Sequence, residues 1–385
     1  MLYYALRITI KTMKLEILQE NLAKSLSIVS RIISSRAQLP ILNNVLLSTD
    51  RGRLKISATN LETGINFWIG AKIEKEGIVS IPAKVLTEFV SSLPPEKVQL
   101  ESKQDGLKIT CGSYQAEFVG LPASEFPPIP FLKEKPTLII NHLIEAIPQV
   151  VFAAAQDESR PVLAGVFLKI IGQELILAAT DGYRLSKKKI VGFKEMEKIK
   201  ELEKGLIIPN WALSEVARIA GEKEEEKKLG LNISPQSKQI IFAIDEAEII
   251  SQLIEGEFPE FEKVIPDKTE TKLIIEKEAL LRAVRIASIF ARESANIIKF
   301  EIQNEKLEIS ANTAQVGSNV SEIEVKTEGK KNRIAFNSRY LLDFLNSVDS
   351  EQISFEMSTS LNPGVFKTVG DKTLLHIIMP VRIQE

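Results

Sequence analysis

Two stretches of the sequence combine residue types that suit the binding of another molecule. Ala178–Ser186 reads AATDGYRLS and places an aromatic ring and an arginine just beyond an Asp-Gly turn. Leu374–Ile383 reads LLHIIMPVRI and keeps apolar residues at a chain end, where polar, frayed residues are usual. As structure alone, the first stretch is a β-hairpin and the second a core strand. As a site, their apolar side chains could line a groove, with arginines holding the polar groups of an extended segment.

Residue types that could support catalysis are few and widely spaced. The only histidines in the sequence are His142 and His376, which argues against a histidine-rich metal site or a Ser-His-Asp triad. Cys111 lies in the strand-like LKITCGSY and is better explained as a small buried residue than as a nucleophile. The sequence contains no Walker motif and no G-x-G-x-x-G, H-E-x-x-H, C-x-x-C or G-x-S-x-G pattern. We therefore expect no catalytic residue, metal or cofactor.

The composition is that of an ordinary globular chain. Its 385 residues are 44% hydrophobic and 26% charged, which excludes disordered and collagen-like classes and suggests two or three domains. No apolar run approaches a membrane span, and the short opening MLYYALRITI, which contains Arg7, does not read as a signal peptide. A single cysteine fits the reducing cytoplasm. The 49 basic and 51 acidic residues nearly cancel, so any nucleic-acid binding must depend on where the charges lie.

Three segments of the chain contain the same predicted helices and strands in the same order. This repeat would set where the stretches at Ala178–Ser186 and Leu374–Ile383 lie in the fold. Each segment holds two amphipathic helices separated by several alternating strands. The first helices are predicted over Glu20–Ile33, Asn141–Ala155 and Lys277–Ala291. The second helices each follow a short apolar strand and open with Pro or Asn, residues suited to a helix start. They are predicted over Pro82–Leu93, Pro209–Ala220 and Asn337–Val348.

The spacing of matching positions indicates three copies of one unit. Pro82 and Pro209, at the starts of two second helices, are 127 residues apart. The strands RLKISATN, ELILAATD and KLEISANT each carry an alanine near the end, and the first two alanines, Ala58 and Ala179, are 121 residues apart. Two linkers share Glu-Phe-Pro at a distance of 132 residues. A non-repetitive α+β protein is the alternative, but it would not preserve both order and spacing.

Proline-rich linkers set the predicted boundaries of the copies. The linkers LPASEFPPIP and LIEGEFPEFEKVIP stop regular structure after the first and second copies. The prediction is an N-terminal extension, residues 1–12, followed by domains over residues 13–131, 132–267 and 268–385. Each domain is expected to be α+β, with two helices packed on antiparallel sheet.

The first helices of the outer copies carry basic residues opposite their apolar stripes. Lys24 and Arg31 project from one helix, and Arg282 and Arg285 project from the other. Such residues can simply solvate a helix, and the corresponding helix of the middle copy has only Glu145 as a charged side chain. Acidic residues gather in other segments, so a neutral protein with basic helix faces can still hold a polyanion through phosphates, with little sequence readout.

Several motifs together resemble the bacterial DNA polymerase III beta subunit family, the sliding clamps. They are, in order, MKLEI, QLPILNNVLL, LPASEFP, RPVLAGV, AATDGYRLS, GEFPEFEKVIP and MPVR. The resemblance covers residues 13–383. It implies a non-catalytic processivity factor, a cytoplasmic head-to-tail homodimer whose six domains form a ring around duplex DNA. It also implies a peptide groove for the DNA polymerase III catalytic subunit, the clamp loader, other polymerases and repair proteins.

The resemblance also assigns roles to residues of this sequence. The DNA-facing residues would be Lys24, Arg31, Arg36, Gln156, Arg282 and Arg285. The dimer interface would include Phe118, Ile289 and Phe290. The partner-peptide groove would comprise Arg160, Leu163, Thr180, Gly182, Tyr183, Arg184, Leu185, Pro259, Lys263, Val264, Asn337, Tyr340, Ile377, Met379, Pro380, Val381 and Arg382. Local departures are Pro161 and Val162 where some members carry two tyrosines, and Lys263 where some carry arginine.

Two functions of other classes remain open at this point. One is a monomeric peptide-binding scaffold with no DNA role, which would run in solution as a single chain of 42.9 kDa. The other is a carboxylate-metal hydrolase on a repeated scaffold, which would use Asp157, Asp181 and Asp245 and would show metal-dependent turnover. The lack of a nucleophile–base pattern argues against the hydrolase, and the family resemblance makes the clamp the favoured prediction.

Overall fold

The computed structural model describes residues 12–33, 39–132, 136–140, 142–157, 159–192, 201–221, 228–234, 237–315 and 317–382. The predicted extension, apart from Thr12, and the predicted DNA contact Arg36 lie outside these residues. The chain divides into two compact units. The first unit is Met1–Asn141 with Arg218–Gln252, and the second unit is His142–Ala217 with Leu253–Glu385.

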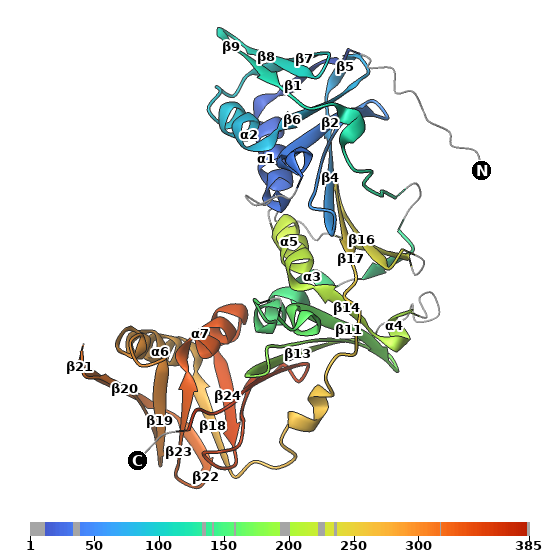
Figure 1. The fold of residues 1–385 in the computed structure, drawn as a ribbon. Coiled ribbons are helices and arrows are strands. Elements are labelled where there is room, and N and C mark those ends of the chain that lie inside the picture. Colours follow the sequence, from blue (N-terminus) through green and yellow to red (C-terminus); the bar gives the residue numbers. More distant parts are fainter. Residues whose placement is uncertain are drawn as a thin grey trace. The chain divides into compact units, whose positions relative to one another are not determined.

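The described part of the first unit contains two antiparallel sheets (Figure 1). A five-stranded sheet has the order β5 (Lys72–Lys75), β1 (Lys14–Leu18), β7 (Lys97–Lys103), β8 (Gly106–Cys111) and β9 (Tyr114–Val119). An eight-stranded sheet has the order β10 (Leu138–Ile140), β15 (Leu229–Ser234), β16 (Gln239–Ile244), β17 (Ala247–Gln252), β4 (Thr63–Gly70), β3 (Arg53–Thr59), β2 (Asn44–Asp50) and β6 (Ile78–Pro82). Residues of β7 are alternately exposed and buried, as a strand with one covered face requires.

The described part of the second unit repeats this plan. A nine-stranded sheet has the order β14 (Leu206–Pro209), β11 (Gly165–Ile171), β12 (Glu174–Thr180), β13 (Arg184–Val191), β26 (Leu374–Ile378), β25 (Gly364–Thr368), β24 (Gln352–Met357), β18 (Thr271–Glu276) and β22 (Lys326–Gly329). A four-stranded sheet has the order β21 (Gly317–Glu324), β20 (Lys306–Thr313), β19 (Ile297–Gln303) and β23 (Asn332–Asn337). Every pairing between these strands is antiparallel, as predicted.

Helices form where five of the six amphipathic patterns predict them. In the first unit α1 (Gln19–Val29) packs on α2 (Ala83–Ser91), and in the second α6 (Lys277–Ala291) packs on α7 (Ser338–Ser347) (Figure 1). The fifth is α5 (Asn210–Gly221), and α4 (Glu201–Lys204) is a short helix before β14. The side chain of Asn337 accepts a hydrogen bond of 3.0 Å from the backbone N–H of Arg339, which caps the start of α7.

The sixth predicted helix, Asn141–Ala155, is wrong. Only α3 (Leu143–Ala146) is α-helical, and 3₁₀ turns over Ile147–Gln149 and Val151–Ala153 follow it. Pro148 explains the break, because proline has no N–H to donate and its ring collides with the carbonyl of the preceding turn. The middle copy therefore presents short turns where the outer copies present long helices.

Two strand pairs join successive copies of the repeat, which the sequence did not predict. In the first unit β4 of the first copy pairs with β17 of the second copy, with Ile65 opposite Ile249. In the second unit β13 of the second copy pairs with β26 of the third copy, with Leu185 opposite Ile377. We call these pairs the first seam and the second seam. Because the middle copy shares a sheet with each neighbour, the compact units differ from the predicted domains.

Phenylalanine rings fill the core of the third copy. Phe336 lies edge-on to Phe300, Phe355 and Phe366, with centroid separations of 5.6, 5.8 and 5.7 Å. All four rings are fully buried, and removing one such ring typically costs about 3–5 kcal/mol. This packing ties β19, β23, β24 and β25 together and so supports the second seam. Within the described residues, the helices are too short or too polar to cross a bilayer.

Candidate functional site

The second seam brings the two conspicuous sequence stretches side by side. Arg184 and Leu185 of the first stretch lie opposite Ile378 and Ile377 of the second. The backbone N–H of Met379 donates to the carbonyl of Tyr183 at 2.8 Å, which continues the pairing beyond the strand. Residues predicted for the groove from the second and third copies are therefore neighbours on one sheet.

A small apolar cluster forms the floor beside this pairing. Leu185 and Ile377 are buried in it together with Ala178 and Val365. Aromatic and aliphatic residues of the linker between the second and third copies pack against the same cluster, namely Phe258, Phe261 and Ile265. The floor is thus a preformed apolar cluster that the linker residues partly cover.

The turn before β13 exposes the side chain of Tyr183 and buries that of its neighbour Arg184. Asp181 accepts hydrogen bonds from the backbone N–H groups of Tyr183 and Arg184 at 2.9 and 3.0 Å, and Thr180 Oγ1 donates to the Arg184 carbonyl at 2.6 Å. Gly182 occupies a left-handed conformation with φ of +91°, which glycine adopts without strain. As a result, Tyr183 is 61% exposed while Arg184 is buried.

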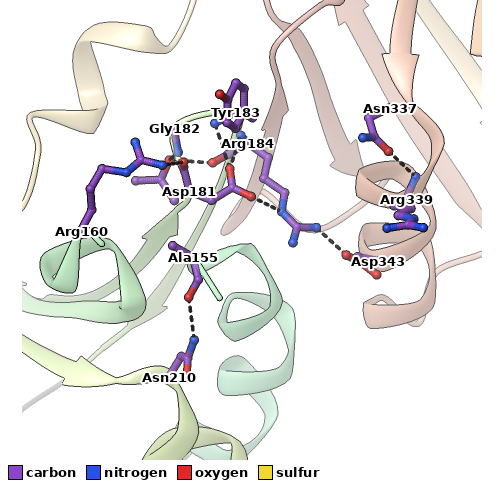
Figure 2. Close-up of polar contacts among 11 residues, drawn as sticks. Ala155, Arg160, Asp181, Gly182, Tyr183, Arg184, Asn210, Asn337, Arg339 and Asp343 are labelled. Atoms are coloured by element: carbon purple, nitrogen blue, oxygen red, sulfur yellow. Dashed lines mark hydrogen bonds and ion pairs between the residues drawn. The ribbon is translucent and has the colours of Figure 1, made fainter. Parts of the chain in front are cut away.

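The guanidinium of Arg184 is held inside the protein by two carboxylates (Figure 2). Its Nε donates to Asp181 at 3.0 Å and its Nη1 donates to Asp343 of α7 at 2.5 Å. The ring centroid of Tyr340 lies 4.6 Å from the guanidinium carbon. A charge this deeply buried needs such partners, and here they join the second copy to the third. Burial and the nearby Asp181 carboxylate raise the pKa of Tyr340, which therefore stays neutral.

Arg160 approaches the same turn from the 3₁₀ segment Pro161–Ala164 (Figure 2). Its Nη2 donates to the Asp181 carbonyl at 3.0 Å, and the side chain stays exposed. Leu163 of that segment is buried, and Asn337 begins α7. Arg160 is thus the accessible arginine on this side of the groove.

The remaining predicted groove residues lie at exposed positions of the linker and the chain end. Pro259, Lys263 and Val264 are exposed in the linker, where Lys263 pairs with Glu260. At the chain end the Val381 N–H donates to the Ala335 carbonyl at 2.9 Å, and Met379 and Arg382 are exposed while Pro380 is half-buried. We call these residues the rim of the groove, and Lys263 and Arg382 give it two exposed basic side chains.

His376 lies on the opposite face of β26 from Ile377 and is fully buried. Its ring stacks on Phe344 of α7 at 4.8 Å, and neither ring nitrogen has a hydrogen-bond partner among the described residues. Burial, and after it the positive charge of Arg184, lower the pKa of His376 to about 3. From the sequence alone this histidine could be interpreted only as a strand residue.

The predicted DNA-facing residues occupy the solvent faces of α1 and α6. Lys24 lies on α1 and Arg31 just after it, and Arg282 and Arg285 lie on α6; all four are exposed. The opposite faces bury apolar residues, among them Leu22, Leu26, Leu280 and Val284. Gln156, from the second copy, is also exposed. The geometry allows phosphate contacts from these side chains, and their role stays a prediction.

The predicted dimer residues divide into exposed and packed ones. Ile289 is exposed near the end of α6, whereas Phe290 is half-buried against the core of its own copy. Phe118 on β9 is half-buried and lies 5.5 Å from Phe89 of α2, edge to face. Two edge strands carry more exposed apolar residues that sequence reasoning missed: Val119 on β9 is 87% exposed and Val320 on β21 is 59% exposed.

The carboxylates considered for a hydrolase have other contacts. Asp157 accepts hydrogen bonds from Ser159, and Asp181 pairs with Arg184. In the part of the chain that the structure describes, no three histidine, cysteine, aspartate or glutamate side chains are grouped to hold a metal. Asp343 is the important carboxylate that sequence reasoning missed. Its position three residues after Tyr340 on one helix face was the available signal.

Three family models match the chain in succession. They are the N-terminal, central and C-terminal domains of the DNA polymerase III beta subunit, over residues 13–130, 137–260 and 262–382. These matches confirm three tandem clamp domains, while the predicted boundaries stay a prediction.

Similar proteins have the same description. The beta sliding clamp of Synechococcus elongatus is 29% identical over 97% of this chain and all of that protein. The Staphylococcus aureus beta sliding clamp is 30% identical over 91% of this chain and 94% of that protein. The solved beta subunit from Thermotoga maritima has a TM-score of 0.86 at 27% identity, and a Bartonella birtlesii clamp bound to griselimycin has a TM-score of 0.88 at 26% identity. Each structure covers 97% of this chain and 100% of its own. The chain belongs to the DNA polymerase III beta subunit family, the non-catalytic sliding clamps.

Proposed function

We propose that this sliding clamp forms a head-to-tail homodimeric ring around duplex DNA, in the cytoplasm. Its groove at the second seam then tethers the DNA polymerase III catalytic subunit. The same groove serves the clamp loader, other polymerases and repair proteins that carry suitable peptides. Tethering makes each rebinding of the polymerase intramolecular, at a high effective concentration, and this gives processivity.

The observation that carries the tethering role is the buried apolar floor of the second seam together with the exposed residues beside it. Leu185 and Ile377 lie beneath an exposed rim that includes Val264 and Met379. A flexible methionine on the rim suits peptides of different sequence. Exposed Arg160 and Arg382 can hold peptide carbonyl or carboxylate groups, while Arg184 positions Tyr340.

Two unpaired sheet edges support the ring. β9 ends the five-stranded sheet and β21 ends the four-stranded sheet, and both carry exposed valines. An exposed apolar edge strand is a site for pairing with another chain. Because β9 lies in the first copy and β21 in the third, pairing them between two chains gives a head-to-tail contact, with Ile289 beside it.

Basic helix faces support the DNA role. Exposed Lys24, Arg31, Arg282 and Arg285 carry positive charge on the helices of the outer copies. Interactions with phosphate alone leave the ring free to slide. Replacing one of these basic side chains by a neutral one should reduce the salt dependence of DNA binding by about one unit of slope.

The test compares how well the protein ring is retained on circular DNA and on linear DNA. Rings closed without a loader should stay on nicked circular plasmid at high salt and leave it when the plasmid is cut, because cutting removes only a topological link. The double variant Ile289→Ala with Phe290→Asp should sediment as a folded monomer and should not be retained. Equal retention on both DNAs, or an unchanged dimer, would contradict the ring.

A further inference from the structure

Lys187 connects the floor of the groove to the linker that carries part of its rim. Leu185 and Lys187 share one face of β13, because side chains alternate along a strand. The Lys187 ammonium is largely buried and donates to Glu262 Oε1 at 2.8 Å. It also lies 5.3 Å from the ring centroid of Phe261. Glu262 immediately precedes Lys263 and Val264, so this contact fixes the chain at the rim.

Aromatic packing holds the linker independently of this ion pair. Phe258 stacks on Phe167 of β11 with centroids 5.0 Å apart, and Phe261 lies edge-on to both rings. Gly205 makes room for this stack, since a Cβ there would lie 2.4 Å from Phe167 Cε2. The stack anchors the linker at Phe258 and Phe261, and Lys187 aligns the turn from which Lys263 and Val264 project.

The charges of this pair are favourable at neutral pH. The hydrogen bond from Lys187 is the first cause that holds the pKa of Glu262 below its ordinary value, and Lys189 and Lys169 add to it. Glu262 itself is exposed, so it can be changed without disturbing a core.

The first unit contains the same contact in a different chemical form. Asn66 Nδ2 of β4 donates to the carbonyl of Pro130 at 3.1 Å. Asn66 precedes Lys187 by 121 residues and Pro130 precedes Glu262 by 132, which are the offsets of the strands and the linkers themselves. The same strand position therefore anchors the linker in both units, and the second unit uses an ion pair for it.

We propose that Lys187 is a positioning residue of the peptide groove, acting through Glu262 to hold Lys263 and Val264 over the floor. This inference rests on the proposed function of the groove. A rim that is already in place spares an incoming peptide the cost of ordering it. Loss of the ion pair should therefore weaken peptide binding without unfolding the protein.

The experiment measures binding to the full-length dimer by fluorescence polarisation and stopped flow. The probes are a labelled clamp-binding peptide from the same organism's polymerase catalytic subunit, and griselimycin. Glu262→Gln and Lys187→Met should weaken the peptide by about fivefold, chiefly through faster dissociation, and Lys187→Glu by about tenfold or more. The charge swap Lys187→Glu with Glu262→Lys should return affinity to within about threefold of the wild type.

Lys188→Met is the matched control. Lys188 makes an ion pair of 2.7 Å with Asp371, is similarly buried, and lies on the opposite face of the same strand. It should leave affinity unchanged. If Glu262→Gln and Lys187→Met bind like the wild type, or if the swap is no better than its single changes, Lys187 does not position the groove. If the wild type itself binds neither probe, the proposed groove fails instead.

Discussion

The first and second seams share one backbone frame. In the first, Thr59 Oγ1 donates to the Thr63 carbonyl at 2.8 Å, as Thr180 does to Arg184 in the second. The Gln252 N–H donates to the Glu62 carbonyl at 2.9 Å, where Met379 donates to Tyr183 in the second seam. The repeat therefore provides the same turn and the same strand pairing in each unit.

Side chains make the two seams different. Gly64 occupies the position that Leu185 has in the second seam. Ile129 of the linker fills the space, because its Cγ2 lies 2.7 Å from the position that a Cβ added at Gly64 would take. Gln252 replaces Met379 and donates through its side chain to the Leu61 carbonyl at 3.2 Å. Both linkers therefore pack on their seams, but the residue at the strand end bonds to the turn in the first seam and is the exposed, apolar Met379 in the second. A repeated frame sets where a groove can form, and a few side chains decide whether one does.

The largest expected effect comes from removing the end of the second seam. Deleting Met379–Glu385 removes Met379, Val381 and Arg382 from the groove and leaves β26 in place. Peptide affinity should fall by about 100-fold or more, since the deletion takes several side chains from around one apolar floor at once. Calorimetry on the truncated dimer measures this, and its retention on circular DNA should persist when rings are closed without a loader.

The first seam provides the matched control for this truncation. Gln252→Ala changes the residue that corresponds to Met379 and removes only the bond to the Leu61 carbonyl. Peptide affinity should be unchanged in that variant. Equal losses in the two proteins would mean that the seams do not differ in function as their side chains suggest.

The second expected effect is a loss of stability in acid that His376 causes. The equivalent position in the first seam is Ile249, which cannot be protonated. The folded state keeps His376 neutral down to a pKa of about 3, whereas the unfolded chain protonates it near its ordinary value of 6.5. Protons therefore favour unfolding below pH 6.5. At pH 5 the loss from this group should be about 2 kcal/mol.

His376→Phe should remove this loss while keeping a ring against Phe344. Urea unfolding of the two proteins at pH 7.5 and pH 5 gives the comparison, because carboxylates titrate alike in both. At neutral pH the variant should also be more stable by about 1 kcal/mol or more, since two unpartnered nitrogens are gone. Parallel pH profiles for the two proteins would show that the histidine finds a partner in solution.

The repeat could be predicted from the sequence, because it depends on local patterns, whereas the groove residues stay a prediction. Offsets of 121 and 127 residues located the strands and the second helices, and unusual residue types marked the loop at Tyr183 and the strand at Ile377. The family resemblance supplied the individual groove residues.

What the sequence could not provide depended on pairing between distant segments. Shared sheets between copies follow from strand edges that meet only in the folded chain, so both seams were missed. The break at Pro148 could have been predicted from the sequence, because proline interrupts a helix. The apolar pattern of the segment led instead to the prediction of one continuous helix. The partners of Arg184 depend on α7 approaching β13, and periodicity alone does not give that approach.

The third expected effect tests how the first seam is closed. Gly64→Ala places a methyl group against Ile129 Cγ2 and should cost about 1–3 kcal/mol. Ile129→Leu in the same protein removes that branch and should recover at least part of the loss, as a double-mutant cycle would show. Gly70→Ala, on the same strand with nothing within 4 Å, is the control. An equal cost at both glycines would point to strand propensity rather than to the linker.

The smallest expected effect compares Leu61 with Gly182, the equivalent positions of the two turns. Leu61 has φ of +79° and is 49% exposed, so it adopts a conformation that L-residues avoid and gains little burial. Leu61→Gly should relieve about 1–2 kcal/mol of strain, less about 0.5–1 kcal/mol for the added flexibility of the unfolded chain. The reverse change, Gly182→Ala, meets φ of +91° and a contact of 3.2 Å with Arg160 Nη1, and should destabilise by about 1 kcal/mol. Urea unfolding measures both, and only Gly182→Ala should also weaken the peptide. A loss of stability in Leu61→Gly would mean that the Leu61 side chain makes stabilising contacts. The first seam would then differ from the second in its turn as well as in its linker.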